Sequence, residues 1–437
     1  MSDIINAFPG YEYVISKSVD KEGHEVISGK NMYRGEDVGK GGYVYAEPGV
    51  YGNVALLDVA SLHPHSIIAM NCFGEYTKNF KDLLDARLYI KHRELDKART
   101  MLNGKLAPFL TDDILGKMSD DEREKHFDSI SKALKIAINS VYGLTAASFD
   151  NPFRDSRNVN NIVALRGALF MVNLKHEVQD RGFKVVHIKT DSIKIANATQ
   201  DIIDFCMDYA KSYGYTFEHE ATYDRICLVN NAVYIARYSS DRAINGKHAG
   251  QWTATGKQFQ VPYVFKKLFS HEDIEFRDLC ETREVQTGIY LDMNENLPDV
   301  SQAEKRLEKL RADISKKGST SEEIENEISS LNDVIRAGHN LRYIGKVGLF
   351  TPVIDGAGGG LLVRLNDHGD IAKYDSVAGA KEYRWLESEI VQMMGYESKI
   401  DYRYFDKLVE DARAAINERD DFEWFASSPE PFNPLPF

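Results

Sequence analysis

The stretch VVHIKTDSIKI, residues 185–195, contains two apolar runs separated by a short polar segment. β-Branched residues dominate both runs and favour strands, whereas the polar residues between them favour a tight turn. The sequence therefore predicts a β-hairpin whose turn carries Asp191, which would hold this carboxylate at a rigid strand end.

A second buried strand is predicted for residues 54–59, an apolar run interrupted only by Asp58. If the two strands lie in one sheet, Asp58 and Asp191 can meet across it. Nucleotidyl transfer uses two divalent cations about 3.5–4 Å apart, and hard cations such as Mg²⁺ prefer carboxylate oxygens. Each aspartate alone is more typical of a turn or cap; the pair predicts a two-metal site.

Two helices are predicted over residues 79–103 and 120–142, and together they can form a helical hairpin. Arg87 and Lys91 are four residues apart on the first, and Lys135 and Asn139 are four apart on the second, so each pair shares one helix face. Cations on such faces suit a triphosphate, to which Ser61, just past the first strand, can add a hydroxyl donor. An Arg-x-x-x-Lys pair alone usually marks a solvated face.

Four segments, in this order, resemble motifs of family B DNA polymerases. Residues 58–64, DVASLHP, are similar to motif A, D-x-x-S-L-Y-P-S. Residues 83–91, LLDARLYIK, resemble the fingers signature L-L-x-x-R-x-x-x-K, and residues 135–143, KIAINSVYG, match motif B, K-x-x-x-N-S-x-Y-G. Residues 189–192, KTDS, resemble the end of motif C, Y-x-D-T-D-S. The resemblance extends over about residues 41–267.

The resemblance implies a set of site residues. The catalytic residues would be Asp58 and Asp191, and the carbonyl of Val59 and the auxiliary carboxylate of Glu220 would complete the ligands of two Mg²⁺ ions, with Mn²⁺ as an alternative. The nucleotide-binding group would comprise Ser61, Leu62, His63, Arg87, Lys91, Lys135, Asn139 and Tyr142. The DNA-binding group would comprise Gly143, Thr190, Ser192 and Tyr234.

The fold implied is an α+β right-hand polymerase fold with an antiparallel-sheet palm, helical fingers and a mainly helical thumb. Four segments follow from it: residues 1–78, the N-terminal segment and first part of the palm with motif A; 79–143, the fingers with motif B at their end; 144–260, the palm with motif C; and 261–437, the thumb and C-terminal extension. Within the last, the charged residues 301–335 predict a solvated helical hairpin broken at Gly318.

The sequence departs from the family pattern at several positions. His63 stands where the family has the tyrosine that packs under the incoming sugar, which leaves discrimination against ribonucleotides open. His63 and His65 would share one side of a strand, so a metal-binding pair is a second interpretation, although no third ligand is identified. Lys189 replaces the first aspartate of D-T-D, and asparagines replace the lysines expected before Tyr234.

The function that the resemblance implies is template-directed DNA synthesis, in which dNTPs are added to a primer 3′-end by two-metal nucleotidyl transfer. Because Asp58 is preceded by only 57 residues, we expect no intrinsic 3′→5′ exonuclease and a layout of viral or phage type. Two alternatives are a catalytically silent, polymerase-like DNA-binding subunit and a half-enzyme that needs a separate exonuclease partner.

Composition limits the partners and the location. The net charge of −13 disfavours a protein that simply coats nucleic acid, but residues 78–105 carry eight basic against four acidic side chains. We expect primed DNA template and dNTPs as ligands, and a separate exonuclease, a clamp or a terminal protein as further partners. No apolar run approaches the ~20 residues that span a bilayer and no secretory signal is visible, so we expect no membrane and a cytoplasmic location, the host cytoplasm if viral. The four scattered cysteines predict reduced thiols.

Overall fold

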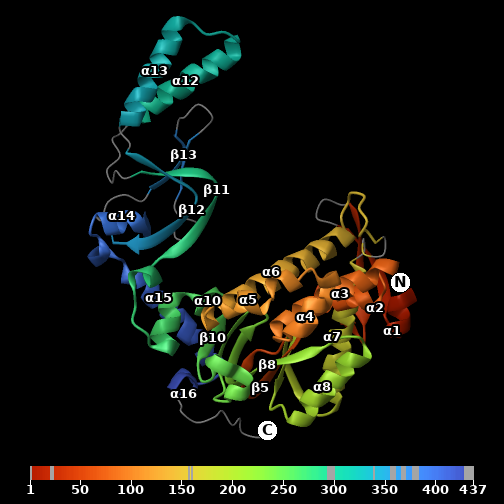
Figure 1. Cartoon of the computed structure of the whole chain (residues 1–437). Helices are drawn as coiled ribbons and strands as arrows, with labels where there is room; N and C mark the ends of the chain where they lie inside the picture. Colours follow the sequence, from red (N-terminus) through yellow and green to blue (C-terminus); the bar gives the residue numbers. More distant parts are fainter. Residues whose placement is uncertain are drawn as a thin grey trace. The chain divides into compact units, whose positions relative to one another are not determined.

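The computed structural model describes residues 2–19, 24–155, 158, 161–292, 301–337, 340–354, 361–365, 371–375 and 383–427. The chain divides into two compact units (Figure 1). Unit 1 contains residues 1–255 together with residues from 419 onward, and unit 2 contains residues 256–418. Each is a mixture of helices and an antiparallel sheet, so the predicted α+β class is confirmed.

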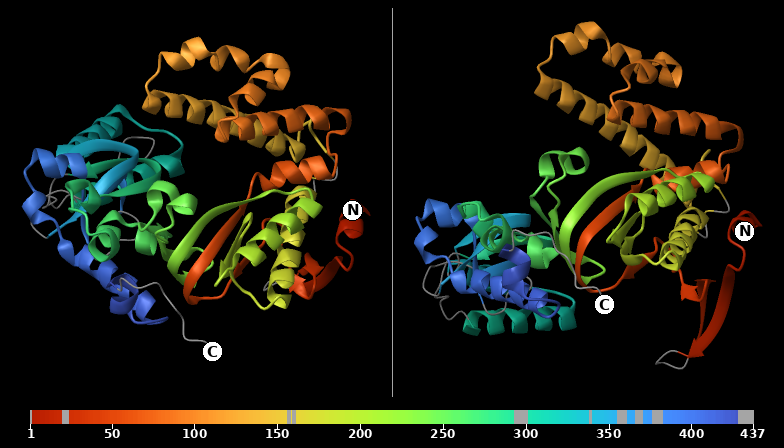
Figure 2. Two further views of the ribbon diagram at one scale, coloured as in Figure 1. Left: turned by 60° about the horizontal axis from the view of Figure 1, so that its bottom comes forward. Right: turned by 90° about the horizontal axis from the view of Figure 1, so that it is seen from below.

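The centre of unit 1 is a seven-stranded sheet in which every neighbouring pair is antiparallel. Across the sheet the strands are β10 (Trp252–Thr255), β9 (Val233–Tyr238), β8 (Phe217–Asn230), β5 (Gly49–Val59), β7 (Ser192–Ala196), β6 (Lys184–Lys189) and β4 (Val44–Ala46). Figure 2 shows that the sheet is strongly curled and that helices lie along one of its faces. The two predicted aspartate strands, β5 and β7, are direct neighbours in it.

The covered face of the sheet packs against α2 (Leu62–Ala69), α7 (Ile162–Asp180) and α8 (Gln200–Ser212). Side chains alternate along a strand, so Leu57 on β5 and Ile193 on β7 enter this core. Helix α7 is buried along most of its length. A Cβ at Gly167 of α7 would lie 2.7 Å from Cδ2 of Leu62, so the absence of a side chain there lets α2 approach α7 and fixes the start of α2.

The predicted helical hairpin is present and is formed by α3 (Thr77–Lys91) and α6 (Asp120–Thr145). It has its own apolar core, to which the short helices α4 (Leu95–Thr100) and α5 (Asp112–Gly116) contribute. The first helix is shorter than the predicted 79–103 because Arg93 adopts a left-handed backbone, φ 61°, that no helix can continue through. A capping box between Ser119 and Glu122 starts α6.

The N-terminal residues form helix α1 (Ser2–Ala7) and a three-stranded antiparallel sheet, β1 (Glu12–Val19), β2 (Glu25–Tyr33) and β3 (Glu36–Asp37). Glu36 joins this small sheet to α7, because its carboxylate accepts hydrogen bonds from the ammonium group of Lys175 at 2.6 and 2.7 Å. Burial acts to raise the pKa of Glu36, but the hydrogen bonds from Lys175, Tyr43 and His176 outweigh it and leave the pKa below its ordinary value. This network anchors the N-terminal segment on unit 1.

Unit 2 contains a five-stranded antiparallel sheet in the order β14 (Ile371–Asp375), β13 (Leu361–Leu365), β11 (Glu281–Asp292), β12 (Leu341–Val353) and β15 (Arg384–Glu387). Its helices are α10 (Lys257–Gln260), α11 (Pro262–Phe265), α12 (Ser301–Lys317), α13 (Glu322–Ala337), α14 (Ser388–Met393) and α15 (Tyr402–Asn417). The expectation of a mainly helical region did not include this sheet, which accompanies the helices. Its strands lack the strict apolar–polar alternation by which a half-buried strand is recognised, as in EVQTGIY, residues 284–290.

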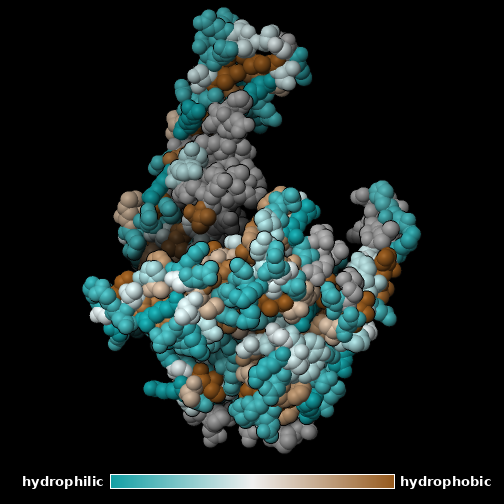
Figure 3. Space-filling view, turned by 45° about the vertical axis from the view of Figure 1, so that its right-hand side comes forward, coloured by the Kyte–Doolittle hydropathy of each residue, from teal (hydrophilic) through white to brown (hydrophobic). Residues whose placement is uncertain are grey.

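The predicted hairpin between residues 301 and 335 is confirmed as α12 and α13, and Gly318, with φ 66°, ends the first helix. Leu307, Leu310 and Ile335 are buried between the two helices. Figure 3 shows a hydrophobic strip on this hairpin that is bordered by hydrophilic residues. The hairpin is thus amphipathic, as its charge pattern indicates.

The boundary between the units follows Thr255, and the chain returns to unit 1 at Arg419. There α16 (Phe422–Ser427) packs on the sheet: Phe425 is fully buried, its carbonyl accepts a hydrogen bond from Arg225 at 2.9 Å, and its ring contacts Trp252. Unit 1 also contains helix α9 (Arg242–Asn245). The four cysteines form no disulfide. Within the described part of the chain, no helix combines the length and apolar character needed to cross a bilayer.

Candidate active site

A cavity of about 290 Å³ lies in unit 1 where the sheet meets the helical hairpin. Six segments build it: the end of β5, the start of α2, α3, α6, the β6–β7 turn and the start of β8. Its lining comprises Asp58, Val59, Ala60, Ser61, Leu62, His63, Pro64, Arg87, Leu88, Lys91, Lys135, Ile138, Asn139, Tyr142, Asp191 and Glu218. Segments that are far apart in the sequence thus meet around one space.

The two aspartates face this space from neighbouring strands. Asp58 lies opposite Ser192 in the β5–β7 ladder, and the amide of Val59 donates a hydrogen bond to the carbonyl of Asp191 at 2.8 Å. The β6–β7 connection is a two-residue turn with Thr190 at φ 58°, and Ser61 after β5 has φ 63°. Left-handed backbone costs a non-glycine residue roughly 1–3 kcal/mol, and such residues concentrate at functional sites. The two turns therefore aim Asp58 and Asp191 into one cavity.

The carboxylates around Asp58 repel one another. Burial, together with the charges of Asp191, Glu220 and Glu218 and against the opposing charge of Lys91, raises the pKa of Asp58 to about 7. A divalent cation would relieve this repulsion, and carboxylate oxygens are the ligands that Mg²⁺ and Mn²⁺ prefer. The donor set of Asp58 and Asp191 therefore fits a hard divalent cation.

The cavity does not present a complete ring of protein ligands. Among the described residues, no three His, Cys, Asp or Glu side chains are grouped as a metal-binding cluster. Mg²⁺ ordinarily keeps several waters and takes only one or two carboxylates, with phosphates of the substrate as further ligands. Two aspartates beside a space for a phosphorylated ligand agree with that pattern.

Three cations reach the cavity from the helical hairpin. Arg87 and Lys91 share a face of α3, as their spacing predicts, and the guanidinium group of Arg87 lies 3.5 Å from the hydroxyl of Ser61. Lys91 forms an ion pair with Glu218 at 2.5 Å. Lys135 lines the cavity from α6, and among the described residues neither it nor Arg87 forms an ion pair. The Nε of Arg87 is buried without a hydrogen-bond partner, so this cation has donor capacity for an anionic ligand.

His63 and Tyr142 form one wall of the cavity. Their rings stack with centroids 4.8 Å apart and planes at 13°. Burial lowers the pKa of His63, although the charge of Asp191 opposes it, and its Nδ1 is buried without a hydrogen-bond partner. A neutral imidazole with an unused nitrogen is suited to a hydroxyl or amide of a ligand.

The strand expected at His63 and His65 is wrong, and with it the geometry of the alternative metal pair. Both residues lie on helix α2, where positions two apart do not share a face. Pro64 is tolerated because it lies in the first turn, whose amides have no intrahelical acceptor. His65 instead places its Nδ1 3.1 Å from the carbonyl of Ser61.

Most predicted site residues are brought together, and the cavity lining contains all eight of the nucleotide-binding group as well as Asp58, Val59 and Asp191. The remaining predicted residues do not line it: Gly143, Thr190, Ser192, Tyr234 and Glu220. Glu220 is the extra residue of a β-bulge, because Leu56 pairs with Ala221 and Leu57 pairs with His219.

Glu218 is the carboxylate that the sequence did not single out. It lies directly opposite Asp58 in the β5–β8 ladder and lines the cavity. Residues 218–220, EHE, contain two candidate carboxylates, and strand alternation puts both on one face. Only the register, including the bulge, distinguishes them, and no local sequence signal fixes that register.

The concentration of basic residues near the cavity is partly neutralised in the folded chain. Lys81 pairs with Asp85, Lys97 with Glu94, and Arg99 with both Asp96 and Asp112. Fewer basic side chains therefore remain available to a ligand than the count in residues 78–105 indicates, and these lie at the cavity.

No protein-family model matches the chain. A stretch of 220 residues, 46% of the chain, is 24% identical to DNA polymerase 1 of Sulfolobus acidocaldarius, of which it covers 24%. A stretch of 229 residues, 49% of the chain, is 23% identical to DNA polymerase 1 of Saccharolobus solfataricus, of which it covers 25%. The matched part of the chain thus spans about a quarter of the length of these relatives. Over about half its length, the chain is a distant homologue of archaeal DNA polymerase 1.

Proposed function

We propose that this chain is a template-directed DNA polymerase of the family B type, which adds deoxynucleotides to a primer 3′-end. The observation that carries the proposal is the cavity in which Asp58 and Asp191 face Arg87, Lys91 and Lys135. Carboxylates for divalent cations and three cations for phosphates, around one space, are what nucleotidyl transfer requires. The distant homology to DNA polymerase 1 supports the same activity.

The residues of the cavity have different roles, which follow from their chemistry. Arg87, Lys91 and Lys135 bind the triphosphate through charge-assisted hydrogen bonds, and Ser61 adds a hydroxyl. Asn139, Tyr142 and His63 form the wall against which the nucleotide lies. Asp58 and Asp191 hold the divalent cations, which when bound supply a polarised primer hydroxyl and neutralise phosphate charge.

In the reaction the primer 3′-hydroxyl loses its proton to solvent and its oxygen forms a bond to the α-phosphorus. The bond from that phosphorus to the bridging oxygen breaks, so that pyrophosphate leaves. The leaving group gains negative charge, which the cationic face of α3 and Lys135 stabilise. These groups act mainly by position and charge, because phosphoryl transfer needs little covalent chemistry from the protein.

Lys91 must change partner when nucleotide binds. Without nucleotide its ammonium group is held by Glu218, at 2.5 Å, next to Asp58. A triphosphate competes with that carboxylate for the same cation. Release of Glu218 would leave its charge beside Asp58, where Asp58 and Asp191 would hold a divalent cation that could neutralise it. Lys91 and Glu218 therefore link nucleotide binding to metal binding.

Extension of a labelled primer by the purified chain, with Mg²⁺ and dNTPs and with no partner added, tests the activity. We expect template-dependent extension by the wild type and none by Lys135→Ala combined with Arg87→Ala. Failure of the folded wild type to extend, together with retained binding of primed DNA, would favour the DNA-binding subunit. Extension restored by a host lysate would favour the half-enzyme.

A further inference from the structure

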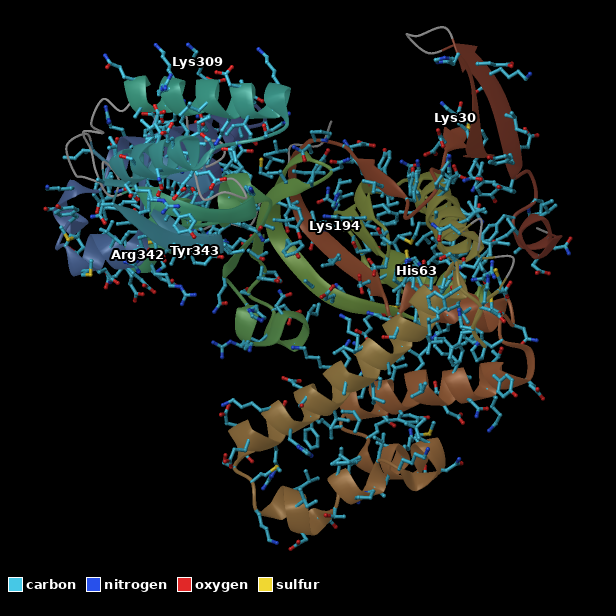
Figure 4. The ribbon with its side chains drawn as sticks, turned by 90° about the horizontal axis from the view of Figure 1, so that it is seen from above. Lys30, His63, Lys194, Lys309, Arg342 and Tyr343 are labelled. Atoms are coloured by element: carbon cyan, nitrogen blue, oxygen red, sulfur yellow. The ribbon has the colours of Figure 1, made fainter. Side chains whose placement is uncertain are left out.

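Lys194 is a buried lysine on the face of the sheet that α2, α7 and α8 do not cover. Its neighbours Ile193 and Ile195 enter the core beneath those helices, so strand alternation places Lys194 on the opposite face. Lys194 is only 3% exposed, and it lies opposite Leu56 in the β5–β7 ladder. Figure 4 shows Lys194 on the strands of the sheet, with His63 nearer the helices.

Two side chains from other strands contact the ammonium group of Lys194. It donates a hydrogen bond to Nδ1 of His187 on β6 at 3.2 Å, and it lies 4.8 Å from the ring centre of Tyr234 on β9. The other ring nitrogen of His187 lies 3.1 Å from the carbonyl of Asn231 in the β8–β9 turn. Because an ammonium group can only donate, Nδ1 accepts and the imidazole proton lies on Nε2.

None of these partners is an anion. Burial, with the charge of Lys194, lowers the pKa of His187 to about 4, so this imidazole is neutral at pH 7. Among the described residues, no carboxylate lies within 4.0 Å of the ammonium group of Lys194, so none forms an ion pair with it. Burial lowers the pKa of Lys194 to about 8, while the charges of Glu220 and Asp58 favour the charged form.

A second buried lysine shows how the chain normally satisfies such a group. Lys175 is 4% exposed and contacts both carboxylate oxygens of Glu36 and the hydroxyl of Tyr43. A buried charge without a partner costs several kcal/mol, so an unneutralised ammonium group is rarely kept for packing alone. Lys194 therefore differs from Lys175 in lacking an anion.

The position of Lys194 indicates which anion it takes. Lys194 lies two residues after Ser192 on β7, on the same face of the sheet, and Ser192 lies opposite Asp58. Asn231, which contacts His187, is exposed, so the surface lies beside the partner of Lys194. If the primer terminus lies at Asp58 and Asp191, a strand that approaches it along this face of the sheet passes Lys194. Its backbone carries the negative charge that the site lacks.

We propose that Lys194 is a positioning residue for the primer strand, held by His187 beneath Tyr234 so that its ammonium group binds a backbone phosphate near the 3′-end. This inference rests on the proposed function. Tyr234 and the β8–β9 turn then form the edge of the same contact, which gives them a role outside the nucleotide cavity. Lys194 orients the strand and takes no part in bond formation.

The test measures equilibrium binding of primed DNA by the full chain, with a series of primers in which single phosphates near the 3′-end are replaced by neutral methylphosphonates. We expect Lys194→Met to bind the natural primer roughly 10- to 100-fold more weakly and to lower the salt-dependence slope by about 1. The wild type should lose a similar factor with one particular neutral linkage, to which Lys194→Met should be insensitive. Lys194→Arg should restore part of the affinity.

Two controls keep the outcomes separate. Lys211→Met, an exposed lysine on α8, should leave binding, the salt slope and the linkage pattern unchanged. Lys194→Met should unfold at the same urea concentration as the wild type or a higher one, because it removes a buried charge. If that variant is as sensitive as the wild type to every linkage, the inference is wrong while the polymerase proposal stands. If the wild type neither binds nor extends primed DNA, both fail.

Discussion

At the scale of the residue, Asp58 illustrates the conflict between stability and function. Its folded pKa is about 7, against 3.8 in an unfolded chain, so between these values the folded state retains a proton that the unfolded state releases. The favourable contribution of Asp58 to the free energy of unfolding is therefore complete below about pH 4 and is lost as the pH rises to 7. Above pH 7 the ionised carboxylate repels its neighbours in the metal-free protein.

We therefore expect Asp58→Asn to stabilise the metal-free protein at pH 8. The gain should be on the order of 1–3 kcal/mol, since solvent screens part of the effect, and it should be much smaller at pH 5. Urea unfolding in EDTA at the two pH values measures it, with Asp150→Asn, at an exposed carboxylate, as the control. A destabilised variant at pH 8 would contradict the described electrostatics.

His63 sets a second expectation at this scale. Its ring stacks on Tyr142 and leaves Nδ1 unpaired in the cavity, where a phenol would occupy more space. We predict that His63→Tyr lowers incorporation of ribonucleotides relative to deoxynucleotides by about 10-fold or more, because a sugar 2′-hydroxyl would meet the larger ring. Single-nucleotide competition assays measure the ratio. His65→Gln, on the other side of α2, should leave it unchanged; an unaltered ratio in His63→Tyr would remove His63 from the sugar contact.

At the scale of the element, α6 presents two lysines three residues apart with different surroundings. Lys135 lines the cavity and Lys132 does not. Lys135→Ala should raise the KM for dNTPs by roughly 10- to 100-fold, the loss expected for one charge-assisted hydrogen bond to phosphate, with little change in DNA affinity. Lys132→Ala should change neither. Steady-state kinetics with saturating primed DNA decides, and an effect on DNA affinity alone would rule out the triphosphate role of Lys135.

The local elements around the site were predictable because each has a local physical signal. The hairpin at Asp191 follows from β-branched runs around polar turn residues, and the α3 and α6 faces follow from four-residue spacing. The choice between Glu218 and Glu220 was not predictable, because a one-residue bulge decides it. The short α2 at His63 was missed because Pro64 between two histidines gives no helical period, and only packing on Gly167 fixes it.

Long-range arrangements were the least predictable part. Lys194 and His187 both occur in the stretch that predicts the hairpin and lie opposite each other in it, but Tyr234 comes from β9, two strands beyond the neighbour of β7, and its contact with Lys194 depends on the curl of the sheet. The sheet of unit 2 and the return of α16 to unit 1 likewise rest on contacts between distant segments. Propensity and periodicity carry no information on such contacts.

At the scale of the whole molecule, the return of the chain at Arg419 makes unit 1 discontinuous in sequence. Phe425 is its fully buried anchor, beside Trp252 and Arg225. We expect Phe425→Ala to lower the free energy of unfolding by about 3–5 kcal/mol, the usual loss for a buried phenylalanine. The control is Phe149→Ala, because Phe149 is 60% exposed, and it should change little. Equal effects of the two changes in urea unfolding would mean that α16 does not contribute to unit 1.

The central claim is that Asp58 and Asp191 act in the chemical step on DNA. The most direct test measures, in the same preparations, single-turnover nucleotide incorporation and the Kd for primed DNA of the wild type, Asp58→Ala and Asp191→Ala in Mg²⁺. We predict that both variants lose incorporation by several orders of magnitude while their Kd for DNA stays within about 3-fold of the wild type. Substantial incorporation by either variant would contradict the account.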